Sequence, residues 1–84
     1  MNLVTLDKLK PGETGIIKNV NGEGALRRRF LDLGLTPNTS ILVRKVAPLG
    51  DPIEIYLRNF ELTLRKNEAS HIEVLTEERV ADGK

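Results

Sequence analysis

GEGALRRRFLDLGLTPN, residues 22–38, decides the fold, because it holds the only convincing helical period in the chain. Leu26, Phe30 and Leu33 recur at i, i+4 and i+7, so a helix places them on one face. The glycine-rich start of the stretch puts the beginning of this helix near Gly24. The pattern predicts one amphipathic helix of about three turns.

The end of this helix has its own signals. Gly34 stands where a helix commonly ends in a left-handed residue, a conformation that glycine adopts without a steric penalty. Pro37 and Asn38 then suit the two central positions of a turn, since proline fixes φ and asparagine tolerates positive φ. We therefore expect Gly34 and Pro37 to be structural residues that stop the helix and turn the chain.

Length and composition limit the classes of protein that the chain can be. With 84 residues, 39% hydrophobic and 30% charged, it is expected to form one soluble domain with a single small core. The net charge of +1 makes nucleic acid an unlikely partner class, and the absence of cysteine excludes disulfides, thiolate metal sites and cysteine nucleophiles. No apolar run reaches the ~18 residues of a membrane span. We expect a cytoplasmic protein.

Outside the helix, most of the chain has the pattern of short strands. Ile53, Ile55 and Leu57 alternate with polar residues, and this is the cleanest period of two in the sequence. The preceding strand is expected to place Ile41, Val43 and Lys45 on one face. The expected strands span residues 13–20, 41–46, 53–58, 61–65 and 72–75. Residues 3–9 are expected to form a short lead-in.

These strands define an architecture. About five short strands joined by glycine and proline turns predict a mainly β fold, a small SH3-like barrel with one inserted α-helix. Asn67 is expected to cap a single helical turn over residues 68–71. We expect one domain over residues 1–75 and a flexible C-terminal tail over 76–84. An exposed strand edge would allow a weak homo-oligomer.

Few residues suggest chemistry. His71, Glu68 and Glu73 are of types that bind zinc or iron, and they are weak candidates for a metal site. The alternative is that all three are solvated surface residues. The chain has a single histidine and no cysteine, and no catalytic triad can be recognised, so we expect no catalytic site, no enzyme activity and no bound cofactor.

The densest run of charge is Arg27, Arg28 and Arg29. Three consecutive helical residues span about 200°, so they cannot all face one ligand. Arg27 and Arg28 are candidates for partner binding, with a solvated helix face as the alternative. Arg29 is expected to be structural, with its stem along the barrel and its guanidinium on a carboxylate or carbonyl.

The second candidate for partner binding is the loop APLGDP, residues 47–52. It is long for a hairpin, two prolines stiffen it, and rigidly held loops often carry binding residues. Leu49 at the tip, with Asp51 and Pro52 beside it, would suit a protein contact. An ordinary surface loop remains the alternative.

Four segments together resemble the FeoA family, the small cytoplasmic component of bacterial ferrous iron transport. They are LDKLKPGETGII, RRRFLDLGLTPN, VAPLGDPIEI and LTLRKNEASHIEV, and they cover roughly residues 3–75 in the order and spacing of the family. Asn38 departs from the glycine that usually follows the proline, which positive φ at asparagine accommodates.

The resemblance implies an SH3-like barrel that is an accessory to FeoB, a membrane iron permease with a cytosolic G-protein domain. It thus implies a protein partner, a role in iron transport with transition metal ion binding, and a place at the inner face of the membrane reached through that partner. The same domain type forms the C-terminal part of metal-dependent repressors. A metal-sensing or nucleic-acid-binding barrel is therefore the alternative function.

Overall fold

The computed structural model describes residues 2–76 as a sheet with two helices and a short 3-10 turn. The mainly β fold predicted from the sequence is confirmed. In chain order the elements are β1 (Asn2–Thr5), η1 (Leu6–Lys8), β2 (Thr14–Val20), α1 (Gly24–Asp32), β3 (Ser40–Val46), β4 (Ile53–Leu57), β5 (Phe60–Leu64), α2 (Lys66–Ala69) and β6 (Ile72–Thr76).

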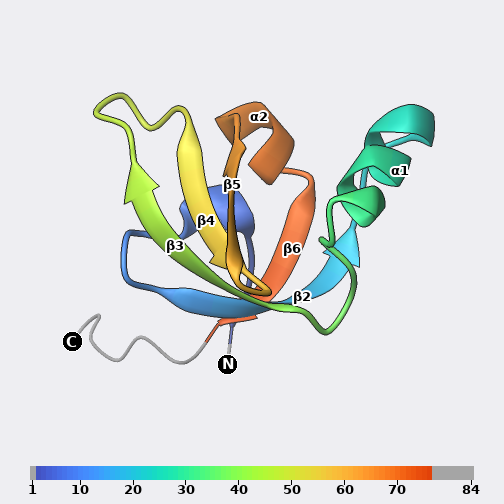
Figure 1. The fold of residues 1–84 in the computed structure, drawn as a ribbon, viewed down its shortest axis with the longest axis horizontal. Coiled ribbons are helices and arrows are strands. Elements are labelled where there is room, and N and C mark those ends of the chain that lie inside the picture. Colours follow the sequence, from blue (N-terminus) through green and yellow to red (C-terminus); the bar gives the residue numbers. More distant parts are fainter. Residues whose placement is uncertain (1, 77–84) are drawn as a thin grey trace.

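All strand pairs are antiparallel, and the sheet has the order β1-β6-β2-β3-β4-β5. The sheet curls around the core, with α1 beside the end of β2 and α2 between β5 and β6 (Figure 1). Residues 2–76 contain six strands where about five were expected, because residues 2–5 form a strand that pairs with β6. The expected lead-in is thus wrong at its start.

The core is apolar and continuous. Ile53, Ile55 and Leu57 are each at most 1% exposed, so the faces predicted for this strand are confirmed. Of the adjacent pair in β2, Ile17 is fully buried and Ile16 is 44% exposed. Burying an aliphatic side chain of this size contributes about 1.5–3 kcal/mol, so the inward row of each strand drives the folding of the barrel.

The faces predicted for β3 are wrong after Val43. The register with β4 shifts between Val43 and Lys45, where a β-bulge inserts one extra residue. Val46 therefore pairs with buried Ile53 and packs against the core, whereas Lys45 is exposed. Strict alternation would have placed a lysine among buried aliphatic side chains, which is the sequence signal for this bulge.

The helix ends as the sequence predicted. Gly34 has φ 97°, its N–H donates to the Leu31 carbonyl at 3.1 Å, and the N–H of Leu35 donates to the Phe30 carbonyl at 3.0 Å. These two bonds make a Schellman motif. Phe30 and Leu35 are both fully buried, so the motif fixes α1 to the barrel. Half-buried Leu26 and Leu33 complete the predicted apolar face.

The turns are partly as expected. Asn38 has φ 73°, and the N–H of Thr39 donates to the Thr36 carbonyl at 3.2 Å, so the predicted turn is confirmed. The expected strands at 53–58 and 61–65 leave residues 59–60 for a turn, but the turn lies one residue earlier, because Arg58 and Asn59 take positive φ and form it. Two such residues make a turn of the type that matches the twist of a hairpin.

Two boundaries near the C-terminal end need correction. The second helix begins at Lys66, so Asn67 lies inside it and is not its cap. Thr76 belongs to β6, is 4% exposed and donates from its hydroxyl to the Thr14 carbonyl at 3.0 Å. The expected tail therefore starts one residue too early, and its residues 77–84 lie outside the described part of the chain.

Candidate protein-docking surface

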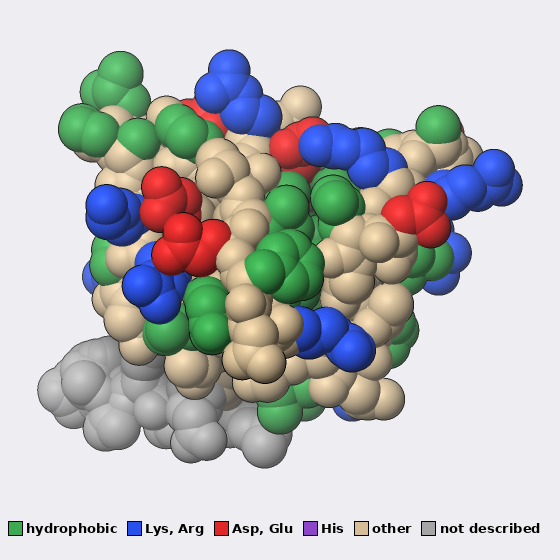
Figure 2. All heavy atoms as spheres, viewed as in Figure 1, with side chains coloured by type: hydrophobic (Ala, Val, Ile, Leu, Met, Phe, Trp, Pro, Cys, Tyr) green, Lys and Arg blue, Asp and Glu red, His purple; other side chains and the backbone are tan. Residues whose placement is uncertain are grey.

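The loop at residues 47–52, between β3 and β4, is closed by its own backbone. The N–H of Ala47 donates to the Pro52 carbonyl at 3.0 Å, and the N–H of Gly50 donates to the Ala47 carbonyl at 2.7 Å. Leu49 at the tip is 92% exposed. Figure 2 shows hydrophobic side chains protruding at the corner where Figure 1 places this loop. The loop thus holds an apolar side chain in solvent on a defined backbone.

Asp51 connects this loop to α2. Its Oδ1 accepts a hydrogen bond from the backbone N–H of Lys66 at 2.9 Å and lies 3.9 Å from Nη1 of Arg65. The first N–H groups of a helix have no partner inside the helix, and a carboxylate there is favoured by the helix dipole. Asp51 therefore anchors the loop, and its accepting oxygen is engaged within the chain.

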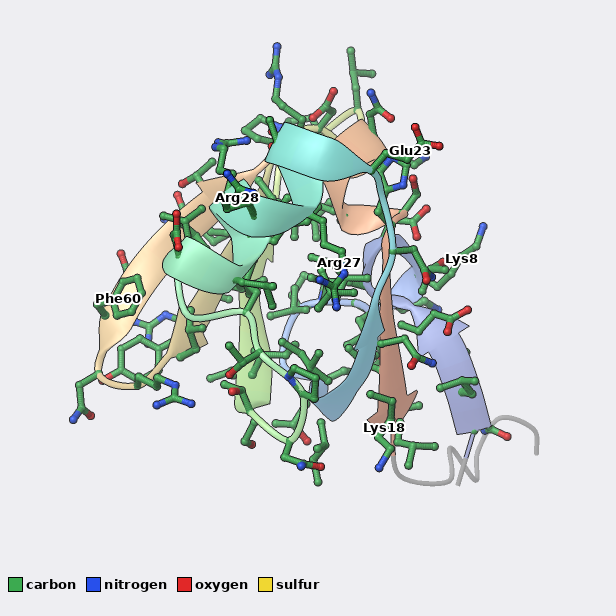
Figure 3. The ribbon with its side chains drawn as sticks, turned by 90° about the vertical axis from the view of Figure 1, so that its right-hand side faces the viewer. Lys8, Lys18, Glu23, Arg27, Arg28 and Phe60 are labelled. Atoms are coloured by element: carbon green, nitrogen blue, oxygen red, sulfur yellow. The ribbon has the colours of Figure 1, made fainter. Side chains whose placement is uncertain are left out.

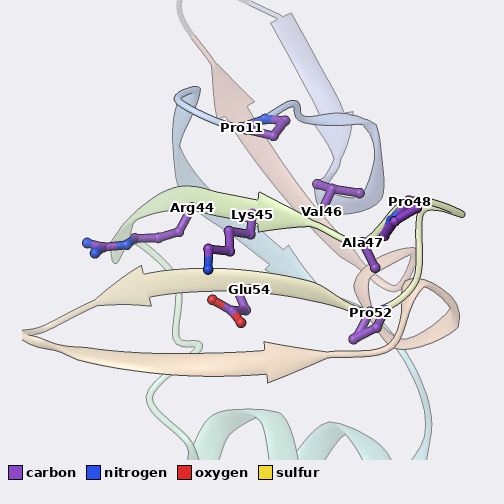
Figure 4. Close-up of a pocket in the computed structure, with 8 residues that line it drawn as sticks. All are labelled: Pro11, Arg44, Lys45, Val46, Ala47, Pro48, Pro52 and Glu54. Atoms are coloured by element: carbon purple, nitrogen blue, oxygen red, sulfur yellow. The ribbon is translucent and has the colours of Figure 1, made fainter.

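A shallow groove of about 500 Å³ runs beside the loop (Figure 4). Its wall is apolar at the loop end, where Pro48 and Pro52 lie, and charged along the strands, where Arg44, Lys45 and Glu54 lie. The bulge in β3 leaves the two consecutive cations exposed beside each other. The remaining lining residues are Pro11, Val46 and Ala47.

The three arginines of α1 have three different environments. Arg27 donates from Nε to the Val20 carbonyl at 3.0 Å, and Nη1 of Arg29 lies 2.6 Å from Oε2 of Glu68. Arg29 thus pairs with a carboxylate of α2, and its structural role stays a prediction. Arg28 is exposed and has no hydrogen bond or ion pair to any residue of the described part. Figure 3 shows that the side chains of Arg27 and Arg28 leave the helix in different directions.

Glu68 is held by two partners. Its Oε1 accepts from the backbone N–H of Arg65 at 2.9 Å, and its Oε2 pairs with Arg29. The Arg65 N–H hydrogen bond and then the Arg29 hydrogen bond hold the pKa of Glu68 below its ordinary value. A carboxylate stabilised in this way is a structural contact between α1 and α2.

The candidate metal ligands do not form a cluster. Glu68 faces Arg29, while Glu73 accepts from the Asn19 amide at 2.8 Å. His71 lines a hollow with Gly22, Glu23 and Leu26. Within residues 2–76, no group of three or more His, Asp or Glu side chains is placed to hold a metal ion.

The groove residues Arg44, Lys45 and Pro11 were not among the predicted contacts. The groove depends on the bulge and on the approach of residue 11 to β3, where the N–H of Gly12 donates to the Val43 carbonyl at 2.8 Å. Neither feature follows from periodicity. The one signal of the bulge in the sequence was Lys45, which strict alternation placed on the same face as buried Ile41 and Val43.

The sequence model of the FeoA domain matches residues 4–75. The chain belongs to the FeoA domain family. A Porphyromonas gingivalis protein, the Fe(2+) transport protein A/Fe(2+) transporter FeoB fusion protein, is 35% identical to this FeoA domain over 69 residues. That match covers 82% of the chain and only 8% of the fusion protein.

Solved structures agree with this assignment. The FeoA protein of Chlorobium tepidum is 41% identical, with a TM-score of 0.81 over 89% of this chain and 71% of that one. The FeoA of Stenotrophomonas maltophilia, solved with zinc and described as a prokaryotic SH3 domain protein, has a TM-score of 0.78 over 90% of this chain and 98% of that one. At 23% identity the latter shows the fold alone, and it confirms the predicted SH3-like architecture.

Within residues 2–76 the longest helix is α1, and neither helix has the length and hydropathy that crossing a bilayer requires.

Proposed function

We propose that this FeoA domain is a non-enzymatic accessory of ferrous iron uptake that docks from the cytoplasm on a FeoB-type permease. The observation that carries the proposal is the fusion protein, in which a segment similar to this chain is joined to a FeoB transporter. When two domains are joined in one chain, each is present at a high effective concentration near the other. Such a fusion favours domains that act together.

The docking surface that we propose has two separate parts, the loop at residues 47–52 and Arg28 of α1, which lie toward opposite ends of the molecule (Figure 1). Leu49 supplies an exposed apolar anchor and Pro52 supplies part of the groove wall. Arg28 supplies a cation that has no competing partner in the described part of the chain. Burial of an apolar anchor, with charge at the rim, is the common composition of a protein interface.

Asp51 and Arg27, which were predicted as contacts, take a different part in this proposal. Both are already bonded within the chain, Asp51 to the N-terminus of α2 and Arg27 to the Val20 carbonyl. They would position the docking surface, and the contact itself would fall to Leu49, Pro52 and Arg28.

The test is a titration of the FeoA domain against the FeoB-type permease of the same organism, full length in detergent and as its soluble G-protein domain. Binding and GTP hydrolysis are followed with GDP and with a GTP analogue. The matched variants are Leu49→Ser and Leu3→Ser, since Leu3 is also exposed but lies in β1. We expect only Leu49→Ser to weaken binding. Absence of binding to either form of the permease would overturn the proposal.

A further inference from the structure

Strand β5 is an open edge of the sheet. Among the strands of residues 2–76 it pairs only with β4. Leu57 and Phe60 flank the turn that joins the two strands, so they form a hydrogen-bonded pair. Because such pairs alternate along an antiparallel ladder, the N–H and C=O groups of Glu61 and Thr63 point to the open side. An unpaired edge of this kind is a template for another strand.

This edge is also accessible and partly apolar. Glu61 and Thr63 are exposed, and Phe60 is 40% exposed. Leu62 of β5 and Leu31 of α1 are only partly buried. Figure 2 shows hydrophobic side chains gathered between the positions of β5 and α1. The edge therefore offers apolar surface as well as backbone hydrogen bonds to an added strand.

The sequence of β5 is complementary to itself. In an antiparallel pair centred on Leu62, all five residues of the strand find a partner. Leu62 faces Leu62 of the second copy, Phe60 faces Leu64, and Glu61 faces Thr63. Glu61 and Thr63 are the two residues whose backbone groups point outward, so the pair forms with full hydrogen bonding and no like charges opposed.

We propose that this FeoA domain self-associates through β5, pairing antiparallel with a second copy in the register centred on Leu62. The two sheets then join edge to edge across a two-fold axis. An interface of one short strand per copy is small, so the dimer is weak and depends on concentration. The surface is separate from the loop proposed for docking.

Other two-fold registers are less favourable. Centring the pair on Glu61 opposes two carboxylates at the axis, which destabilises a cross-strand pair. Centring it on Thr63 leaves Phe60 without a partner in β5 and uses only three residues of each strand, since the strand ends at Leu64. The register centred on Leu62 is thus the one that uses the whole edge without a charge conflict.

The first test is a matched pair of charge substitutions at Thr63, with the dimer dissociation constant measured by sedimentation up to millimolar concentration. The two-fold axis creates two pairs of Glu61 with Thr63 of the other copy. Thr63→Lys places a lysine opposite Glu61 in both pairs, and Thr63→Glu places a glutamate there. We expect Thr63→Lys to tighten the dimer and Thr63→Glu to weaken it, each by about twofold to thirtyfold. A wild-type protein that stays monomeric overturns the proposal, and so does weakening by both variants, which indicates a pair centred on Thr63.

The second test uses the absence of cysteine from the sequence. Leu62→Cys puts two thiols opposite each other at a non-hydrogen-bonded pair, where the Cα separation of about 4.5 Å allows a disulfide. Leu49→Cys is the control, because Leu49 is far more exposed but lies outside β5. We expect faster oxidation to a covalent dimer for Leu62→Cys. Equal or slower oxidation than the control overturns the proposed register.

Discussion

Asp51 and Lys66 join the loop at residues 47–52 to α2, since the Asp51 carboxylate accepts the backbone N–H of Lys66 at 2.9 Å. The same residue thus serves as a cap for a helix that begins 15 positions later in the chain. The loop that carries exposed Leu49 is therefore held at two points, by its own backbone bonds and by the end of α2.

Replacing Asp51 with alanine is expected to destabilise the protein by about 0.5–2 kcal/mol, the usual effect of removing a helix cap. Lys66 N–H would lose its acceptor, and the loop would lose its anchor. Chemical denaturation measures the change. Asp51→Asn keeps an acceptor oxygen and should retain most of the stability. If both variants were as stable as the wild type, the contact would have no role in holding the loop.

Replacing Glu68 with glutamine should remove a pH-dependent part of the stability. The Arg65 N–H and then the Arg29 guanidinium lower the pKa of Glu68 in the folded protein, so folding favours its ionised form. This contribution is present above the unfolded pKa and is lost as the pH falls through the lowered folded pKa. We expect the stability advantage of the wild type over Glu68→Gln at neutral pH to shrink below about pH 5.

Unfolding curves at a series of pH values would measure this difference. Glu54→Gln is the control, since Glu54 makes no ion pair or hydrogen bond through its side chain within residues 2–76. A difference between the wild type and Glu68→Gln that stayed constant with pH would contradict the prediction.

Local signals account for the parts of the fold that sequence predicted. The spacing of Leu26, Phe30 and Leu33 and the glycine at position 34 all belong to one helix and its end. They could therefore be recognised without knowing which other segments pack against the helix. The alternation in β4 is equally local. The position of Arg29 on the helix suggested a carboxylate or carbonyl partner, but it did not identify Glu68 of α2 as that partner.

The remaining features depend on contacts between distant segments. Asn67 has the residue type of a cap, but Asp51 arrives from the loop and Glu68 folds back to Arg65, so α2 begins at Lys66. The bulge in β3 similarly depends on pairing with β4. Periodicity contains no information on these pairings, and for that reason the groove and the anchoring of the loop by Asp51 were not predicted.

Replacing Gly34 is expected to destabilise the protein through backbone conformation alone. The φ of 97° is unfavourable for a residue with a side chain, whereas a Cβ there would meet only Arg58 and Leu57 atoms at an ordinary 3.9 Å. Gly34→Val should therefore cost about 1–2 kcal/mol or more, and Gly34→Asn clearly less, since asparagine tolerates positive φ. Thermal unfolding of the two variants would measure the difference. Equal loss in both would point to crowding instead of backbone strain.

Arg27 is hydrogen-bonded, whereas Arg28 has no hydrogen bond or ion pair within residues 2–76, so the two provide a comparison on one helix. Arg27→Ala removes the hydrogen bond to the Val20 carbonyl, so we expect a loss of about 0.5–1.5 kcal/mol of stability. Arg28→Ala should change stability by less than about 0.5 kcal/mol, as is usual for an exposed side chain without partners. Thermal unfolding of the two variants measures both changes, and an equal loss would contradict the comparison.

If Arg28 lies in the permease contact, its removal should slow association with the permease and reduce the dependence of that rate on salt. Stopped-flow association at two salt concentrations measures this effect, and an unchanged rate would remove Arg28 from the proposed surface.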